Sequence, residues 1–235
     1  MSTPSEDAED PRRAFLLRAL AAGLLVTTGF AQAQILGRRP QPLPVGRSVY
    51  EVTGAVTVNN QPATAETRIG AGDRVEVGAG GQLIFVVGSD AFLMRENSRV
   101  DLAGNGFVIN SLRVLTGALL SVFGSGTKRV MTSTAAVGIR GTGLYVESEP
   151  DRSYVCTCYG DVLISAADDT NISERIVSKH HDNPRYVLKP GAAKRIQPAP
   201  FINHTDVELA LIETLVGRTP PFSLFDQDYG GVRRY

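Results

Sequence analysis

The sequence predicts an all-β domain of stacked short strands, arranged as a β-solenoid or a sandwich, with one C-terminal amphipathic helix. Three observations support this fold class. From Ser48 onward, apolar and polar residues alternate with the period of a strand. Turn-forming residues separate the short apolar runs, and 24 of the 235 residues are glycine. Helical spacing appears in one stretch only, after His204.

The expected strands are short and evenly spaced between residues 48 and 165. Each is a run of three to eight residues rich in Val, Ile, Leu or Phe, and most are preceded by Gly or Asn turns. The runs are 49–52, 55–58, 74–77, 82–87, 91–94, 107–114, 119–123, 130–132 and 143–147. A β extension over 166–200 is expected to add a strand at 185–188 and a last short one around Ile196.

The C-terminal part, residues 201–235, predicts a helix and a tail. Thr205 and Glu208 have the spacing of a capping box, in which each side chain accepts a hydrogen bond from the other residue's backbone N–H. Apolar residues then recur at helical spacing up to Gly217, a suitable C-cap. The apolar stripe is expected to pack on the domain. His204 is expected to be exposed near the cap, with a loose tail from Phe222 onward.

The overall composition is that of a globular protein with an ordinary core. Hydrophobic residues make up 43% and charged residues 20%, so folding does not require disulfides. Lys and Arg total 24 and Asp and Glu total 24, which gives a formal net charge of zero. No clustered basic excess is present, and we therefore expect no nucleic-acid partner.

Residues 1–33 are predicted to be a signal peptide of the twin-arginine type. Arg12-Arg13 precedes an apolar, charge-free run from Ala19 to Phe30, and Ala31-Gln32-Ala33 has the small residues of a cleavage site. We expect cleavage, export to the periplasm and no membrane span afterwards, with 34–47 as a Pro-rich linker. An uncleaved anchor is the alternative.

Several short motifs occur in the order found in one family of bacterial envelope proteins. They are Val52–Val56, Ile69–Val75, Gly80–Leu83, Asn97–Val100, Leu115–Leu119 and Thr132–Val146. This series, over residues 48–165, resembles the FecR domain family. The resemblance implies a β-rich, solenoid-like stack and a non-enzymatic signalling or scaffolding role. The ten residues before Pro11-Arg12-Arg13 are too few for the sigma-binding domain of the signalling members, so that role is not transferred.

No enzyme motif is recognisable in the sequence. Gly124-Ser125-Gly126-Thr127-Lys128 lacks the spacing of a phosphate loop, and Gly138–Gly143 lacks the glycine order of a dinucleotide site. Both are better explained as turn glycines, which take positive φ without strain. Arg140 is expected to pair with a carboxylate on a neighbouring strand. We therefore expect a protein that is not an enzyme.

The sharpest local signal is a pair of cysteines followed by a pair of histidines. Cys156 and Cys158 lie two apart on an expected strand, so their side chains should project to the same side. That spacing suits a shared metal better than a disulfide. His180 or His181, or both if the chain bends at Asp182-Asn183-Pro184, could complete a site for zinc or a related transition metal. Asp182 is the carboxylate expected to hydrogen-bond to a histidine ligand from behind.

The sequence supports three hypotheses about function. The leading one is a periplasmic FecR-type binding, scaffold or sensory protein with a metal at Cys156, Cys158, His180 and His181. The second is a metal- or thiol-dependent redox protein that uses the same cluster, and the third is a membrane-anchored regulator with an uncleaved signal. For the cysteines alone, two buried small hydrophobes, a redox pair or an intermolecular disulfide are further alternatives. The partner is an unidentified envelope protein or ligand.

Overall fold

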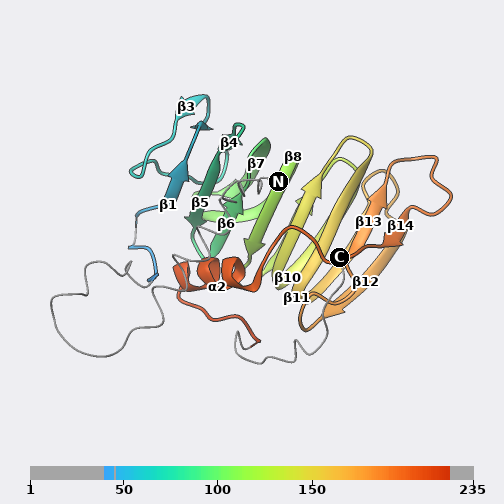
Figure 1. Ribbon diagram of the computed structural model, residues 1–235. Coiled ribbons are helices and arrows are strands. Elements are labelled where there is room, and N and C mark those ends of the chain that lie inside the picture. Colours follow the sequence, from blue (N-terminus) through green and yellow to red (C-terminus); the bar gives the residue numbers. More distant parts are fainter. Residues whose placement is uncertain (1–39, 45, 223–235) are drawn as a thin grey trace, which may run out of the picture. The chain divides into compact units, whose positions relative to one another are not determined.

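The structure is a computed structural model that describes residues 40–44 and 46–222 (Figure 1). The chain divides into two compact units, Met1–Gln41 and Pro42–Tyr235. The expected signal peptide and most of the tail lie outside the described residues. All described strands and the one described helix belong to the second unit, and its mostly β character with a single C-terminal helix confirms the predicted fold class.

The described residues form a 14-stranded sheet in which every pair of strands is antiparallel except β8 with β9. The strands are β1 Val49–Thr53, β2 Val56–Val58, β3 Gln61–Pro62, β4 Arg74–Val77, β5 Gln82–Val87, β6 Asp90–Met94, β7 Ser98–Asn105, β8 Val108–Val122, β9 Thr127–Met131, β10 Ala135–Ser148, β11 Arg152–Ala166, β12 Ser173–Ser178, β13 Arg185–Leu188 and β14 Ile196–Pro198. Helix α2 spans Asp206–Leu215.

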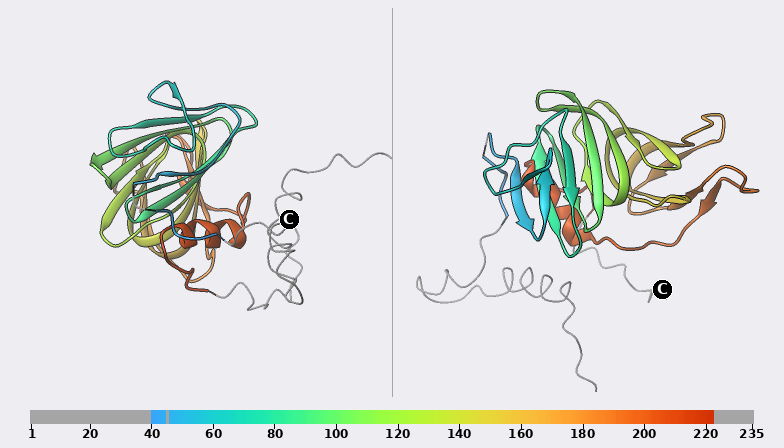
Figure 2. Two further views of the ribbon diagram at one scale, coloured as in Figure 1. Left: turned by 90° about the vertical axis from the view of Figure 1, so that its left-hand side faces the viewer. Right: turned by 90° about the horizontal axis from the view of Figure 1, so that it is seen from above.

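Three long strands, β8, β10 and β11, fold this sheet into two layers (Figure 2). The first half of β8 pairs with β7, whereas its second half pairs with β6. In the same way, one half of β11 pairs with β13 and the other half with β12. A single folded-over sheet therefore forms both layers.

The long strands correct the expectation of separate short ones. Runs 107–114 and 119–123 are the two halves of β8, and run 143–147 is the second half of β10. The bends fall at glycines that take positive φ, at Gly117 (+80°) in β8 and Gly160 (+100°) in β11. These glycines looked like strand ends in the sequence because the same residue type serves turns and bends.

The main core lies between the two layers. Its buried apolar side chains come from strands of both, for example Val75 and Val100 from one and Phe85 and Phe92 from the other. Lys128 of β9, in the glycine-rich segment that resembled a phosphate loop, is also buried here. Its Nζ lies 2.7 Å from Asp90 Oδ2 and donates to the Ile109 carbonyl, so this lysine serves the fold.

The outer face of the second layer is apolar as well. Register places one row of outward side chains across five adjacent strands, and all of them are buried. The row runs through Ile84, Leu93, Leu120, Tyr145 and Cys156. Another part of the chain must therefore cover this face, because an exposed apolar row of this size would be unfavourable in water.

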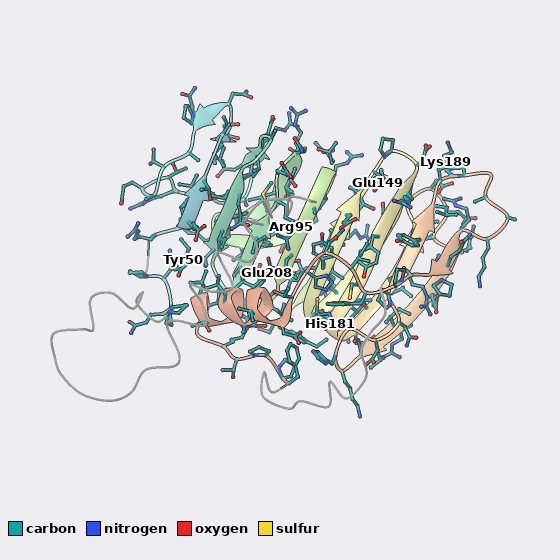
Figure 3. The ribbon with its side chains drawn as sticks, in the orientation of Figure 1. Tyr50, Arg95, Glu149, His181, Lys189 and Glu208 are labelled. Carbon is teal, nitrogen blue, oxygen red and sulfur yellow. The ribbon has the colours of Figure 1, made fainter. Side chains whose placement is uncertain are left out.

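Helix α2 supplies much of that cover and contacts β6 and β8. Leu209, Ile212 and Leu215 are buried, and each such side chain contributes about 1.5–3 kcal/mol when removed from water. The predicted capping box is present, with Thr205 accepting from the Glu208 backbone N–H and Glu208 accepting from that of Thr205. Glu208 also pairs with Arg95 at 2.9 Å (Figure 3).

We predict that Gly117→Ala destabilises the fold by about 2 kcal/mol or more, because the added methyl would lie 2.5 Å from the Ser98 Cα at a positive φ. Gly138→Ala is the control, since its methyl would meet nothing closer than 3.9 Å. Urea denaturation should show a lowered midpoint for Gly117→Ala only. Equal midpoints for the two variants would contradict the assigned bend.

Candidate metal centre

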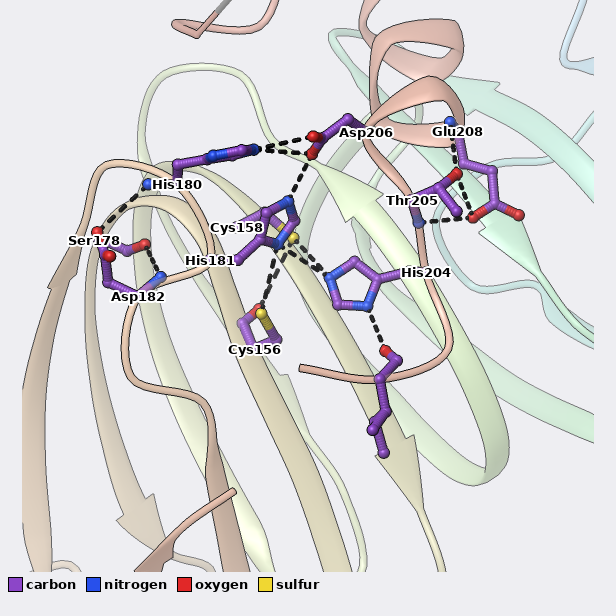
Figure 4. Close-up of polar contacts among 11 residues, drawn as sticks. Cys156, Cys158, Ser178, His180, His181, Asp182, His204, Thr205, Asp206 and Glu208 are labelled. Carbon is purple, nitrogen blue, oxygen red and sulfur yellow. Dashed lines mark hydrogen bonds and ion pairs between the residues drawn. The ribbon is translucent and has the colours of Figure 1, made fainter. Parts of the chain in front are cut away.

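Four buried side chains from three separate segments converge beside the second layer (Figure 4). Cys156 and Cys158 come from β11, His181 from the turn after β12, and His204 from the segment before α2. One donor atom of each lies within 4.8 Å of the other three. This cluster of two thiols and two imidazoles is therefore placed to hold a metal ion.

The two cysteines are brought together by strand geometry and a local bulge. The alternation of β11 puts both side chains on the outer face, as predicted. Between the pairs Leu144↔Thr157 and Gly143↔Tyr159, Cys158 is an extra residue on β11. A bulge of this kind redirects a side chain. Gly143 is required opposite it, because a methyl there would lie 2.6 Å from the Tyr159 ring.

His181 is held by a bend in the chain. Its φ of +54° lies in the left-handed region, and its backbone N–H donates to the Cys158 carbonyl at 2.8 Å. Asp182 stabilises the bend by accepting from the backbone N–H groups of Lys179 and His180. A non-glycine residue in this region costs roughly 1 kcal/mol or more, a strain typical of functional sites. The predicted bend at this element is thus present.

His204 is held against the outer face by stacking and hydrogen bonding. Its ring stacks on that of Tyr145 at a centroid distance of 4.3 Å and an interplanar angle of 20°. The backbone N–H of Ile202 lies 3.3 Å from the Tyr154 hydroxyl, which fixes the chain just before His204. Next to His204, the N-cap Thr205 begins α2, so the position of this imidazole is tied to the start of the helix.

In each imidazole, the ring nitrogen that points away from the cluster faces a hydrogen-bond acceptor. His181 Nε2 lies 2.8 Å from Asp206 Oδ1, and His204 Nδ1 lies 2.7 Å from the Ile202 carbonyl oxygen. Carboxylates and carbonyls only accept hydrogen bonds, so each neutral ring carries its N–H on that side. The remaining nitrogens, His181 Nδ1 and His204 Nε2, then present lone pairs to each other at 3.1 Å. A cation between the two nitrogens, or protons from the neighbouring Cys156 and Cys158 thiols, would satisfy these lone pairs.

Three of the six donor–donor distances match the edges of a tetrahedral metal site, and the other three are no longer than 4.8 Å. With metal–sulfur bonds of about 2.3 Å and metal–nitrogen bonds of about 2.05 Å, tetrahedral edges are about 3.6 Å for S···N and about 3.3 Å for N···N. Cys156 Sγ lies 3.6 Å from His181 Nδ1, and Cys158 Sγ lies 3.5 Å from His204 Nε2. Together with the 3.1 Å separation of the two nitrogens, these three contacts fit such a site.

Without a metal, the cluster redistributes protons instead. Burial opposes ionisation of Cys156, but hydrogen bonds from Cys158, His181 and His204 outweigh it and hold its pKa well below the usual value. Burial raises the pKa of Cys158 well above its usual value. Burial also acts to lower the pKa of His181, yet its hydrogen bonds to Asp206 and Cys156 raise it overall. The metal-free cluster thus favours a Cys156 thiolate beside a protonated imidazole.

The structure brings together three of the four predicted ligands and adds one. Cys156, Cys158 and His181 belong to the cluster, whereas His180 Nε2 lies 3.0 Å from both carboxylate oxygens of Asp206. The carboxylate that hydrogen-bonds to a ligand, His181, is that of Asp206 and not that of Asp182 as predicted. His204 was expected to be exposed but is only 3% exposed, and it completes the set. An unfilled fourth position in a Cys-Cys-His set was the signal that could have identified it.

The cluster is closed. Both cysteines are fully buried, neither is in a disulfide, and His181 and His204 are also buried. Four protein donors fill a tetrahedral shell, which is the pattern of structural metal sites rather than of catalytic ones with an open position. An S₂N₂ donor set of this kind suits zinc.

Comparisons with known proteins add little to this geometry. No family model matches the sequence, and no curated protein matches it. Two crystal structures of a "putative anti-sigma factor" from Parabacteroides distasonis ATCC 8503 are similar, each with a TM-score of 0.44 and 12% identity over 54% of this chain. The match spans 58% of that protein's chain. Within the described residues, no helix is long and apolar enough to cross a membrane.

We predict that His204→Ala lowers the metal content of the protein, whereas His180→Ala leaves it unchanged. His204→Ala removes a buried donor and should lower zinc content at least tenfold after dialysis. His180→Ala leaves all four proposed donors in place and should leave about one zinc per chain. Elemental mass spectrometry on both variants measures this. Retention of zinc by His204→Ala, or its loss from His180→Ala, would contradict the assignment of ligands.

Proposed function

We propose that this protein is an exported, periplasmic scaffold or binding protein of the FecR-domain type, stabilised by one zinc ion on Cys156, Cys158, His181 and His204. The export signal and the FecR-type motifs support the first part of the proposal. The facing lone pairs of His181 and His204, at 3.1 Å, carry the second part. The partner would be another envelope protein or a ligand bound outside this cluster.

Charge balance supports a divalent ion at this site. Two thiolates neutralise a dication, so the buried centre would carry no net charge and would avoid the large cost of burying an isolated ion. The outer nitrogens of both imidazoles are already oriented by Asp206 and the Ile202 carbonyl, which is the usual arrangement behind metal-bound histidines. Structural zinc in such a site contributes directly to folding.

A redox or catalytic role for the same cluster is less well supported. Such a role needs an open coordination position or an accessible thiol, and all four donors are buried. A scaffold with a structural ion requires neither. The buried donors therefore favour a scaffold over the redox alternative.

The first test is expression of the full chain with its own N-terminus, followed by cell fractionation. We expect the protein in the periplasmic fraction, with an intact mass that corresponds to a chain beginning at Gln34. Untagged protein from that fraction should contain about one zinc per chain, and Cys156→Ser/Cys158→Ser should contain none. A membrane-bound chain of full length would contradict export with cleavage, and parent protein without metal would contradict the zinc site.

Zinc affinity should rise with pH, by about tenfold per pH unit for each proton that binding displaces. Cys158, whose pKa is raised by burial, still carries a proton that the ion must displace, whereas Cys156 is already ionised and adds little to the slope. The raised pKa of His181 adds a second displaced proton wherever the metal-free cluster holds a protonated imidazole, and the dependence is steeper over that range. Chelator competition at several pH values measures the slope. An affinity independent of pH between 6 and 8 would contradict this.

A further inference from the structure

The zinc ligands connect parts of the chain that are otherwise far apart. His181 lies 25 residues after Cys156, and His204 lies 46 residues after Cys158. Two ligands are therefore fixed in β11, one is in the turn after β12, and one belongs to the C-terminal segment, defined here as residues 199–217. An ion that holds all four closes both loops and acts as a cross-link between the sheet and this segment.

Ligand position and helix position are coupled within the C-terminal segment. The ligand His204 directly precedes the N-cap Thr205, and Asp206, the first residue of α2, accepts from His181. The helix cannot shift along the sheet without moving His204 and breaking the contact to Asp206. Figure 4 shows the start of the helix immediately beside the cluster.

The remaining attachment of the segment is apolar with a few polar contacts. Leu209 and Ile212 are fully buried over the outer face of the second layer, and the Arg95–Glu208 pair lies near the start of the helix. At the other end, Tyr159 is hydrogen-bonded to Glu213. A helix of ten residues has little stability of its own, so its order depends on these contacts and on its fixed first turn.

We propose that the metal ion controls the docking of the C-terminal segment, so that α2 is held on the sheet when metal is bound and released when it is lost. This inference rests on the proposed zinc site. Loss of the ion leaves His181 and His204 with facing lone pairs or with a shared proton, and the cross-link to β11 is gone. Release uncovers the apolar row that includes Leu93, Leu120 and Tyr145.

Hydrogen exchange followed by mass spectrometry tests the proposal directly. The mature chain is compared with zinc, after removal of zinc by a chelator, and after zinc is added back. Exchange of amides in 207–216 should accelerate at least tenfold without zinc and recover on re-addition, while β7 in the main core stays protected. Stoichiometric zinc with unchanged exchange in 207–216 would overturn this inference alone. A chain that binds no zinc would overturn both it and the proposed zinc site.

Reciprocity provides a second and independent test. If the packing of α2 on the sheet and zinc binding are coupled, a mutation that weakens this packing must lower the zinc affinity by the same factor. Leu209→Ala, which leaves all four donors in place, should lower zinc affinity about tenfold or more. Leu102→Ala is the matched control, because it is the same truncation of a buried leucine in the main core on the other side of the sheet. It should change zinc affinity less than about twofold, and equal effects of the two variants would refute the coupling.

Discussion

Three strands that each belong to two layers are the constraint on which the rest of this structure depends. Because β8, β10 and β11 bend midway, one continuous sheet encloses the main core and also presents a second apolar face outward. That outer face must be covered, and the chain covers it with its C-terminal segment. The candidate metal centre lies where the last of the long strands, the turn after β12 and this cover meet.

The centre also shows how hydrogen-bonding groups can specify a ligand before it binds. Asp206 and the Ile202 carbonyl fix the tautomers of two imidazoles, and the tautomers turn two lone pairs toward each other. In a buried setting such a conflict is costly unless something positive lies between them. A proton transferred from Cys156 relieves part of it, whereas a dication on two thiolates relieves all of it and leaves no net charge. The spacing of the donors, the tautomers of the histidines and the charge balance are therefore all consistent with a bound dication.

Local patterns predicted the local features of this protein well. Period-two runs identified most strands, the Thr205–Glu208 spacing identified the capping box, and strand alternation placed Cys156 and Cys158 on one side. The predictions that were wrong concerned features that depend on contacts between residues far apart in the sequence. Gly117 reads equally as a turn or as a bend, and only pairing of β8 with both layers decides between them. His204 looked like an exposed residue beside a cap because nothing near it in sequence shows that the preceding segment packs on Tyr145.

The spacing of the four donors has a consequence for how the protein is made. During synthesis the two cysteines appear first, and the donor that completes the set is residue 204 of 235, adjacent to the last described helix. A four-coordinate ion can be fully enclosed only after nearly the whole domain has emerged and its cover has arrived. Occupancy of the centre would then mark a domain whose C-terminal segment has been made and packed, and a truncated or half-assembled domain would leave both thiols open to other reactions.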